Sequence, residues 1–189
     1  QTVGDDAART PITPSLMTLQ DLSNYQVKKR TPICTTYRDS YYVCTMPPPS
    51  SGGIAVAQTL GILENFEMSK YPPKNPENEG GIPDVMGVHL VSETERLAYA
   101  DRDKYVADTD FVPLPAKGIA SLIDKNYLKQ RAALINPDQS MGVAPAGQFD
   151  SNAGIDKTVE HGTTQFTIVD AYGNVVSMTS TVEASMGSF

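Results

Sequence analysis

The stretch that decides the fold covers residues 160–183 and reads EHGTTQFTIVDAYGNVVSMTSTVE. Two runs rich in Thr, Val, Ile and Phe flank residues 170–174, which contain the Asp, Gly and Asn typical of a turn. This pattern predicts a β-hairpin. Its loop is residues 171–173, a type I turn followed by Gly173 in the left-handed conformation.

This loop length sets the register of the two strands and therefore the composition of each face, because side chains alternate between faces. The expected opposite pairs are Asp170 with Asn174, Phe166 with Met178, and Thr163 with Thr181. One face is apolar and should turn to a core: Phe166, Ile168, Val176, Met178 and Val182. The other is rich in hydroxyls: Thr163, Gln165, Thr167, Ser177, Thr179, Thr181 and Glu183. A bank of small hydroxyls is typical of a functional site, but Thr is also a common strand former, so both interpretations stay open.

Composition bounds the class of protein. The chain has 189 residues, of which 40% are hydrophobic and 20% charged, as expected for one globular domain with a real core. Its net charge of -7 argues against a nucleic-acid partner, which would need a basic face. No apolar run approaches the roughly 20 residues that span a bilayer, so we expect no membrane span in this section.

The two cysteines fall in a second predicted hairpin. Strands at about residues 30–37 and 41–46 are joined by residues 38–40, a loop length that pairs Cys34 with Cys44. Such a cross-strand pair can form a disulfide, which we expect if the protein is exported. Two buried free thiols are the alternative if the protein is cytosolic.

Helices are predicted between the hairpins. Thr18 and Asp21 suggest a capping box for a short helix to about Tyr25. Four more helices are expected, at about residues 54–66 with Ser50 or Ser51 as cap, 84–101 capped by Asp84, 117–123 and 125–135. The acidic and basic residues at 101–110 predict a salt-bridged surface, because their spacing is not that of a calcium loop. The chain has only two His, of which His89 stands alone in its helix, and it has no paired Cys motif, so we predict neither a metal site nor a cofactor.

Residues 136–162 are rich in Gly, Pro, Asn, Asp and Ser, which predicts a mobile linker. The linker runs directly into Thr163 at the start of a strand. Self-cleavage would need this arrangement, because the chain before the broken bond must flex and the new terminus must then be free. The sequence has no Gly-x-Ser-x-Gly elbow and no Cys–His pair that would provide another nucleophile.

Several separated motifs together resemble one family. Residues 163–183 followed by Gly187 are similar to the signature of the γ-glutamyltransferase (γ-glutamyltranspeptidase) family. Residues 46–53 (MPPPSSGG), 63–66 (LENF) and 99–102 (YADR) also resemble that family, in the same order along the chain. The resemblance extends from about residue 12 to residue 189, and the Thr163–Thr164 hairpin is its most specific part.

The resemblance implies an α+β fold, namely a section of the αββα sandwich of N-terminal-nucleophile hydrolases. Precursors of this family cut themselves before the first Thr of the pair, which here is the bond between Gly162 and Thr163. Residues 1–162 would then be the C-terminal part of a large subunit, ending in the linker at about 136–162. Residues 163–189 would be the N-terminal hairpin of a small subunit. The family also implies a periplasmic or extracellular location and, as partners, the remaining segments of both subunits.

The resemblance also implies roles for individual residues. Thr163 matches the nucleophile, whose freed α-amine would act as its base. It would attack the γ-glutamyl amide of a glutathione-like substrate and pass the acyl group to water, an amino acid or a peptide. Thr181 matches a second Thr that hydrogen-bonds the nucleophile. Glu183 matches a residue that contacts the substrate's α-amine through opposite charge.

Two positions depart from the family pattern and keep alternatives open. Gln165 stands where the family usually has His, and Met186 stands where an aromatic residue is common. These departures leave room for a related cephalosporin-acylase-like enzyme that cleaves a glutaryl amide. A non-catalytic role is also open, because this section lacks part of the expected site and alone should be inactive.

Overall fold

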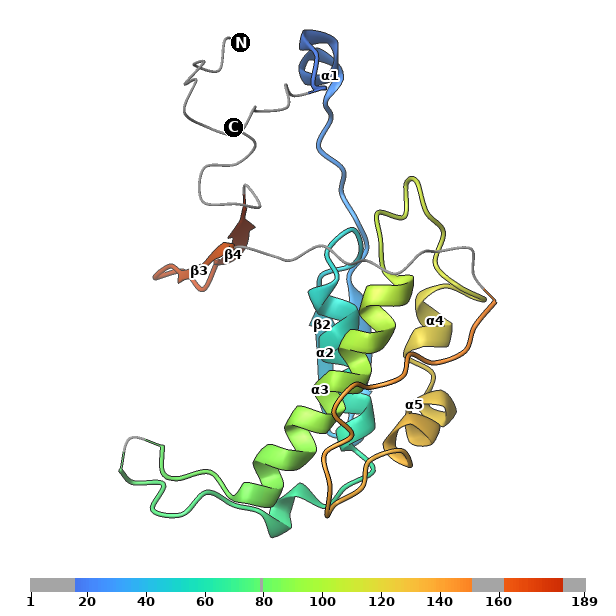
Figure 1. The fold of residues 1–189 in the computed structure, drawn as a ribbon. Helices are drawn as coiled ribbons and strands as arrows, with labels where there is room; N and C mark the ends of the chain where they lie inside the picture. Colours follow the sequence, from blue (N-terminus) through green and yellow to red (C-terminus); the bar gives the residue numbers. More distant parts are fainter. Residues whose placement is uncertain (1–15, 79, 151–161, 182–189) are drawn as a thin grey trace, which may run out of the picture. The chain divides into compact units, whose positions relative to one another are not determined.

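The computed structural model describes residues 16–78, 80–150 and 162–181. The chain divides into two units, residues 29–157 and residues 1–28 together with 158–189 (Figure 1). Helices and short antiparallel strands are both present, so the α+β prediction is confirmed. No helix among the described residues is both long and apolar enough to cross a membrane.

The unit of residues 29–157 is built on two helices that pack together, α2 (Gly52–Leu63) and α3 (Val85–Tyr105). A hairpin of β1 (Ile33–Tyr37) and β2 (Tyr41–Thr45) lies on α2. The shorter helices α4 (Ile119–Leu122) and α5 (Lys125–Ala132) also contact α2 (Figure 1). A 3-10 turn at Met68–Lys70 lies between α2 and α3 in the chain. Because these neighbours cover α2 on several sides, most of its residues are buried.

Two apolar clusters form the core of this unit. One joins Ile62 of α2 to Leu97 of α3 and Leu128 of α5, and the other is centred on Ile54 and Tyr105. Each of these side chains is at most 1% exposed. Gly61 allows the close approach of α5, because a Cβ there would lie 2.3 Å from Leu128 Cδ1.

The helix starts test the capping predictions. Thr18 and Asp21 form the expected capping box at α1 (Leu19–Asn24), and Asp84 accepts hydrogen bonds from the first turn of α3. Ser51 occupies the N-cap position of α2, as predicted, but its side chain makes no cap hydrogen bond there. Its backbone is already helical, whereas a capping serine is usually extended. The Ser51 hydroxyl instead accepts a hydrogen bond from Arg102 Nε at 3.0 Å.

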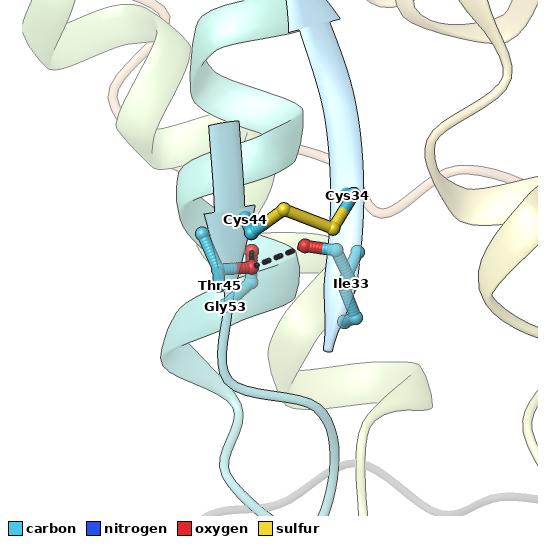
Figure 2. The surroundings of a disulfide bond; sticks show 5 residues. All are labelled: Ile33, Cys34, Cys44, Thr45 and Gly53. Atoms are coloured by element: carbon cyan, nitrogen blue, oxygen red, sulfur yellow. Dashed lines mark hydrogen bonds between the residues drawn. A yellow bond between two sulfur atoms is a disulfide. The ribbon is translucent and has the colours of Figure 1, made fainter. Parts of the chain in front are cut away.

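The β1–β2 hairpin has the predicted register, with Cys34 opposite Cys44 and Tyr37 opposite Tyr41. The two cysteine sulfurs are joined in a disulfide across the strands (Figure 2). At the end of β2, the Thr45 hydroxyl donates to the carbonyl of Gly53 at 3.1 Å. This contact ties the hairpin to the first turn of α2.

A buried charge pair lies where α2, α3 and α5 meet. Asp101 is 1% exposed and Arg131 4% exposed, and Asp101 Oδ1 lies 3.2 Å from Arg131 Nη2. Gln58 Nε2 donates to Asp101 Oδ2 at 3.0 Å, and the Tyr127 hydroxyl donates to the same oxygen. Burial and the bond to Asp101 raise the pKa of Tyr127. The carboxylate is therefore surrounded by donors.

The expectation of a salt-bridged surface at residues 101–110 is thus wrong for Asp101. It is correct for Asp103, which pairs with Arg102 at 3.0 Å, and for Asp110, which pairs with Arg30 at 2.5 Å. The alternating charges gave no sign that one of them turns inward. The difference arises because Asp101 lies on the face of α3 that packs against α2 and α5, whereas the Asp103 side chain is 42% exposed.

Replacing Asp101 with Asn should destabilise the chain strongly, whereas Asp103→Asn should not. The amide leaves Arg131 buried without its counter-charge, which typically costs about 3–5 kcal/mol. Asp103 is partly exposed, and such surface changes usually stay within about 0.5 kcal/mol. Urea unfolding followed by circular dichroism measures both values. Equal free energies of unfolding for the two variants would contradict the assigned role of the buried pair.

Candidate active site

The second hairpin consists of β3 (Thr164–Val169) and β4 (Val175–Ser180). Phe166 lies opposite Met178, and the backbone N–H of Asp170 donates to Asn174 at 3.0 Å, so the predicted register is confirmed. Gly173 has a φ of 82°, the left-handed conformation expected for the loop. The carboxylate of Asp170 closes this loop, and its bonds from the Asn174 side chain and backbone lower its pKa.

The hydroxyl-rich face of this hairpin is internally hydrogen-bonded. Gln165 Nε2 donates to Thr167 Oγ1 at 2.9 Å and to Ser177 Oγ at 3.0 Å. The hydroxyls of Thr167 and Ser177 lie 3.3 Å apart. Gln165, one of the two departures from the family pattern, is therefore an amide donor that links both strands.

The opposite face of the hairpin does not match the expectation of a core face. Among the described residues Phe166 is 40% exposed, Met178 48% and Ile168 59%. The physical reason is that a two-stranded sheet has no second layer of its own. The alternation predicted which side chains share a face, but not whether that face is buried in this chain.

The hairpin brings Gly162, Thr163 and Thr181 together at its open end. Gly162 and Thr163 directly precede β3, and the hydroxyl of Thr181 donates to the carbonyl oxygen of Gly162 at 3.0 Å. Gly162 has a φ of 149°, which residues with a side chain rarely adopt. The resemblance implied a bond from Thr181 to the nucleophile, whereas this bond reaches the carbonyl of the preceding residue. Glu183 and Met186 lie outside the described residues.

Residues 140–149, here called the strap, precede this site in the sequence. The strap lies within the linker predicted at 136–162 and has no helix or strand, but it is hydrogen-bonded along α3. Glu93 accepts bonds from the Ser140 hydroxyl at 2.7 Å and from the Met141 N–H at 2.8 Å. Arg96 Nη1 donates to the carbonyl of Gly142 at 2.7 Å. Residues 151–161 lie outside the described residues.

The buried charge pair and Tyr105 hold the other end of the strap. Arg131 Nη2 donates to the Pro145 carbonyl at 2.6 Å, and Asp101 Oδ1 accepts from the Gly147 N–H at 2.7 Å. The Tyr105 hydroxyl donates to the Gly147 carbonyl at 2.6 Å. A side chain at position 147 would force Tyr127 to move, because a Cβ there would lie 1.9 Å from the hydroxyl oxygen of Tyr127.

Sequence reasoning missed this contact although a signal was present. The strap-binding side chains of α3 are spaced by three to five residues, which places them on one face of a helix: Glu93, Arg96, Asp101 and Tyr105. Of these four residues, only Asp101 and Tyr105 fall within residues 101–110, which were predicted to form a salt-bridged surface. Within the described residues, no group of three or more His, Cys, Asp or Glu is arranged to hold a metal ion.

Comparison with known proteins identifies the family. The γ-glutamyltranspeptidase family model matches residues 4–189, and the chain belongs to this family. It is 38% identical over 182 residues to the glutathione hydrolase proenzyme of Bacillus subtilis (strain 168), covering 91% of the chain and 29% of that protein. It is also 38% identical over 168 residues to the acylase ACY 1 proenzyme of Pseudomonas sp. (strain V22), covering 89% of the chain and 26% of that protein.

The solved structures agree with this assignment. The γ-glutamyltranspeptidase of Helicobacter pylori matches with a TM-score of 0.55 and 36% identity, over 69% of the chain and 34% of that structure. The enzyme of Pseudomonas nitroreducens, complexed with L-DON, matches with a TM-score of 0.54 and 34% identity, over 69% of the chain and 36% of that structure. The chain thus spans about a third or less of the relatives it matches.

Acidification should weaken the strap contact through Glu93. Burial opposes its charge, but bonds from Met141 and Ser140 and the positive charges of His89 and Arg96 outweigh burial and lower its pKa. The stabilisation of the folded state by Glu93 is therefore complete above the pKa of this group in the unfolded chain, near 4.5. It is lost as the pH falls through the lower pKa that Glu93 has in the folded protein.

Glu93→Gln should cost about 1–3 kcal/mol at pH 7, because a charged acceptor of two hydrogen bonds is lost. The variant should also show a smaller decline in the free energy of unfolding below pH 4.5. Glu95→Gln on the exposed side of α3 is the control and should behave as the native chain does. If the free energy of unfolding declines equally below pH 4.5 in all three proteins, the role of Glu93 is refuted.

Proposed function

We propose that this chain is the section of a γ-glutamyl-transferring enzyme that contains its processing bond and its nucleophile. The observation that carries the proposal is the hydrogen bond from the Thr181 hydroxyl to the carbonyl of Gly162, at 3.0 Å. It directs a donor at the carbonyl that Thr163 would have to attack. Family membership supports the same interpretation.

In the proposed processing step, the Thr163 hydroxyl oxygen attacks the carbonyl carbon of Gly162. The Gly162–Thr163 C–N bond breaks, the acyl group moves to the hydroxyl oxygen as an ester, and the nitrogen takes a proton to become the α-amine of Thr163. Water then hydrolyses the ester, which leaves a carboxylate on Gly162 and restores the hydroxyl of Thr163. The Thr181 hydroxyl would stabilise the negative charge that develops on the Gly162 oxygen.

In the proposed turnover, the α-amine of Thr163 is the general base. Its reference pKa near 8 suits proton transfer at neutral pH. The hydroxyl attacks the γ-amide of a glutathione-like substrate, the amine portion leaves, and the γ-glutamyl ester is transferred to water, an amino acid or a peptide. Glu183 would bind the ammonium of the γ-glutamyl group through opposite charge.

The same proposal covers the rest of the molecule. Residues 1–162 would belong to a large subunit and residues 163–189 to a small subunit, with further segments of both completing the αββα sandwich and the substrate pocket. The exposed apolar face of the β3–β4 hairpin fits such a partner layer. The Cys34–Cys44 disulfide supports a periplasmic or extracellular location, because disulfides persist in oxidising compartments.

A second candidate is an acylase that acts on a glutaryl amide. It is favoured by the 38% identity to an acylase proenzyme and by Gln165 at the position where γ-glutamyltransferases usually have His. Both candidates use the same nucleophile and differ only in whether the acyl group carries an α-ammonium. The charge of Glu183 favours the γ-glutamyl substrate, since a carboxylate gains from an ammonium partner.

Thr163→Ala in the full-length protein should leave a single uncut chain without turnover. Thr164→Ala is the matched control, because its side chain points to the other face of β3, and it should still yield two chains. Thr181→Val should slow cleavage by about 10²–10³-fold, the usual cost of one oxyanion donor, whereas Thr181→Ser should restore it. Intact mass measured over time follows each variant. Two chains divided at residue 163 in Thr163→Ala would refute the assigned nucleophile.

The two candidate substrates can be compared directly on the full-length native protein. A γ-glutamyl anilide should be cleaved with a kcat/KM at least about tenfold above that of the glutaryl anilide, which lacks only the α-amine. Glu183→Gln should reduce this preference without abolishing turnover, because the Thr163 nucleophile remains. A preference for the glutaryl compound would establish the acylase alternative instead.

A further inference from the structure

The Cys34–Cys44 disulfide lies on the face of the β1–β2 hairpin that turns away from α2. Ile33 is 4% exposed and belongs to the core, and Thr45, opposite it, bonds to Gly53 of α2. Cys34 and Cys44 are the next pair along the strands, and side chains alternate, so the two sulfurs point to the opposite face (Figure 2).

This outer face is open to solvent along β2. Cys44 is exposed and Cys34 is partly buried. Tyr42, which shares the face with Cys44, is 74% exposed. A thiol approaching from solvent therefore reaches the sulfur of Cys44 more readily than that of Cys34. Access to one particular sulfur is among the factors that set the rate of thiol–disulfide exchange.

The hairpin has supports that do not depend on the disulfide. The guanidinium of Arg38, in the loop, donates to the carbonyl of Phe66 at 2.8 Å, beyond the C-terminal end of α2. The ammonium of Lys125 donates to the carbonyl of Thr36 at 2.7 Å. Together with the burial of Ile33 and the bond from Thr45, these contacts attach β1, the loop and β2 to the helices. Breaking the S–S bond therefore leaves the strands in place.

We propose that this disulfide is a site of reversible modification by small-molecule thiols of the glutathione class, with Cys44 as the sulfur that is attacked. The thiolate attacks Cys44 Sγ, the S–S bond breaks, and Cys34 leaves as a thiolate that takes a proton. The product is a mixed disulfide on Cys44. A second thiol attacks the sulfur of the bound small molecule, which frees Cys44 as a thiol and releases the small-molecule disulfide. Two thiols are oxidised while one protein disulfide is reduced.

This inference goes beyond the proposed function and does not rest on it, because the hairpin reacts whether or not Thr163 is a nucleophile. The two meet in one respect: the substrate proposed for the enzyme is itself a thiol. An enzyme that works on glutathione-like compounds would meet them at the hairpin as well as at its active site.

The experiment incubates the full-length protein, with its Thr163→Ala variant in parallel, with reduced glutathione or 2-mercaptoethanol. The second thiol carries no γ-glutamyl group, so exchange with it separates this proposal from the proposed function. Samples are quenched with acid, alkylated with iodoacetamide and mapped by mass spectrometry. The expected result is one mixed disulfide on Cys44 with an alkylated Cys34, and an unchanged circular dichroism spectrum.

Matched single variants test which sulfur is reached. Cys34→Ser leaves Cys44 alone and should form a mixed disulfide with oxidised glutathione about tenfold faster than Cys44→Ser, which leaves the partly buried Cys34. The proposal is overturned if neither thiol opens the bridge without unfolding the protein. It is equally overturned if the adduct maps to Cys34, or if the two single variants react at the same rate.

Discussion

The buried pair of Asp101 and Arg131 is the interaction on which the helical unit depends. Its carboxylate accepts hydrogen bonds from Gln58 of α2, Tyr127 of α5 and the backbone of Gly147, so one side chain of α3 joins three other segments. Taking two charges out of water is costly unless they are paired and hydrogen-bonded, and here nearly every neighbour is a donor. This cost also makes the arrangement specific: if any of these segments shifts, a buried charge loses part of its compensation.

The β3–β4 hairpin, in contrast, is held by interactions between residues that are close in the sequence. The Asp170 carboxylate, the left-handed Gly173 and the strand pairs set its shape without help from a core. That shape is enough to place the Thr181 hydroxyl against the Gly162 carbonyl. The proposed chemistry therefore begins with Gly162 and Thr181, which are far apart along the chain and are brought together by the strand register. A pocket for the substrate needs surfaces beyond these two strands.

Sequence reasoning succeeded where the responsible interactions are close in the chain. Loop lengths gave both hairpin registers, including the pairing of Cys34 with Cys44, and short polar side chains marked the starts of α1 and α3. It failed where distant segments decide. Ser51 occupies the N-cap position of α2, but its hydroxyl binds Arg102 instead of the helix, and the bonds of residues 140–149 to α3 were not expected. Nothing in the local composition of these residues distinguishes the two outcomes.

The sequence by itself determined the two hairpins, the order of the helices and the family, because turn chemistry, alternation and motif order are properties of neighbouring residues. Only the tertiary structure decided which charges are inside. Asp101 and Asp103 are two residues apart and have the same side chain, yet one is buried and the other partly exposed. The difference depends on whether Arg131, some 30 positions further along the chain, packs against that point of α3, and folding alone brings this partner into reach.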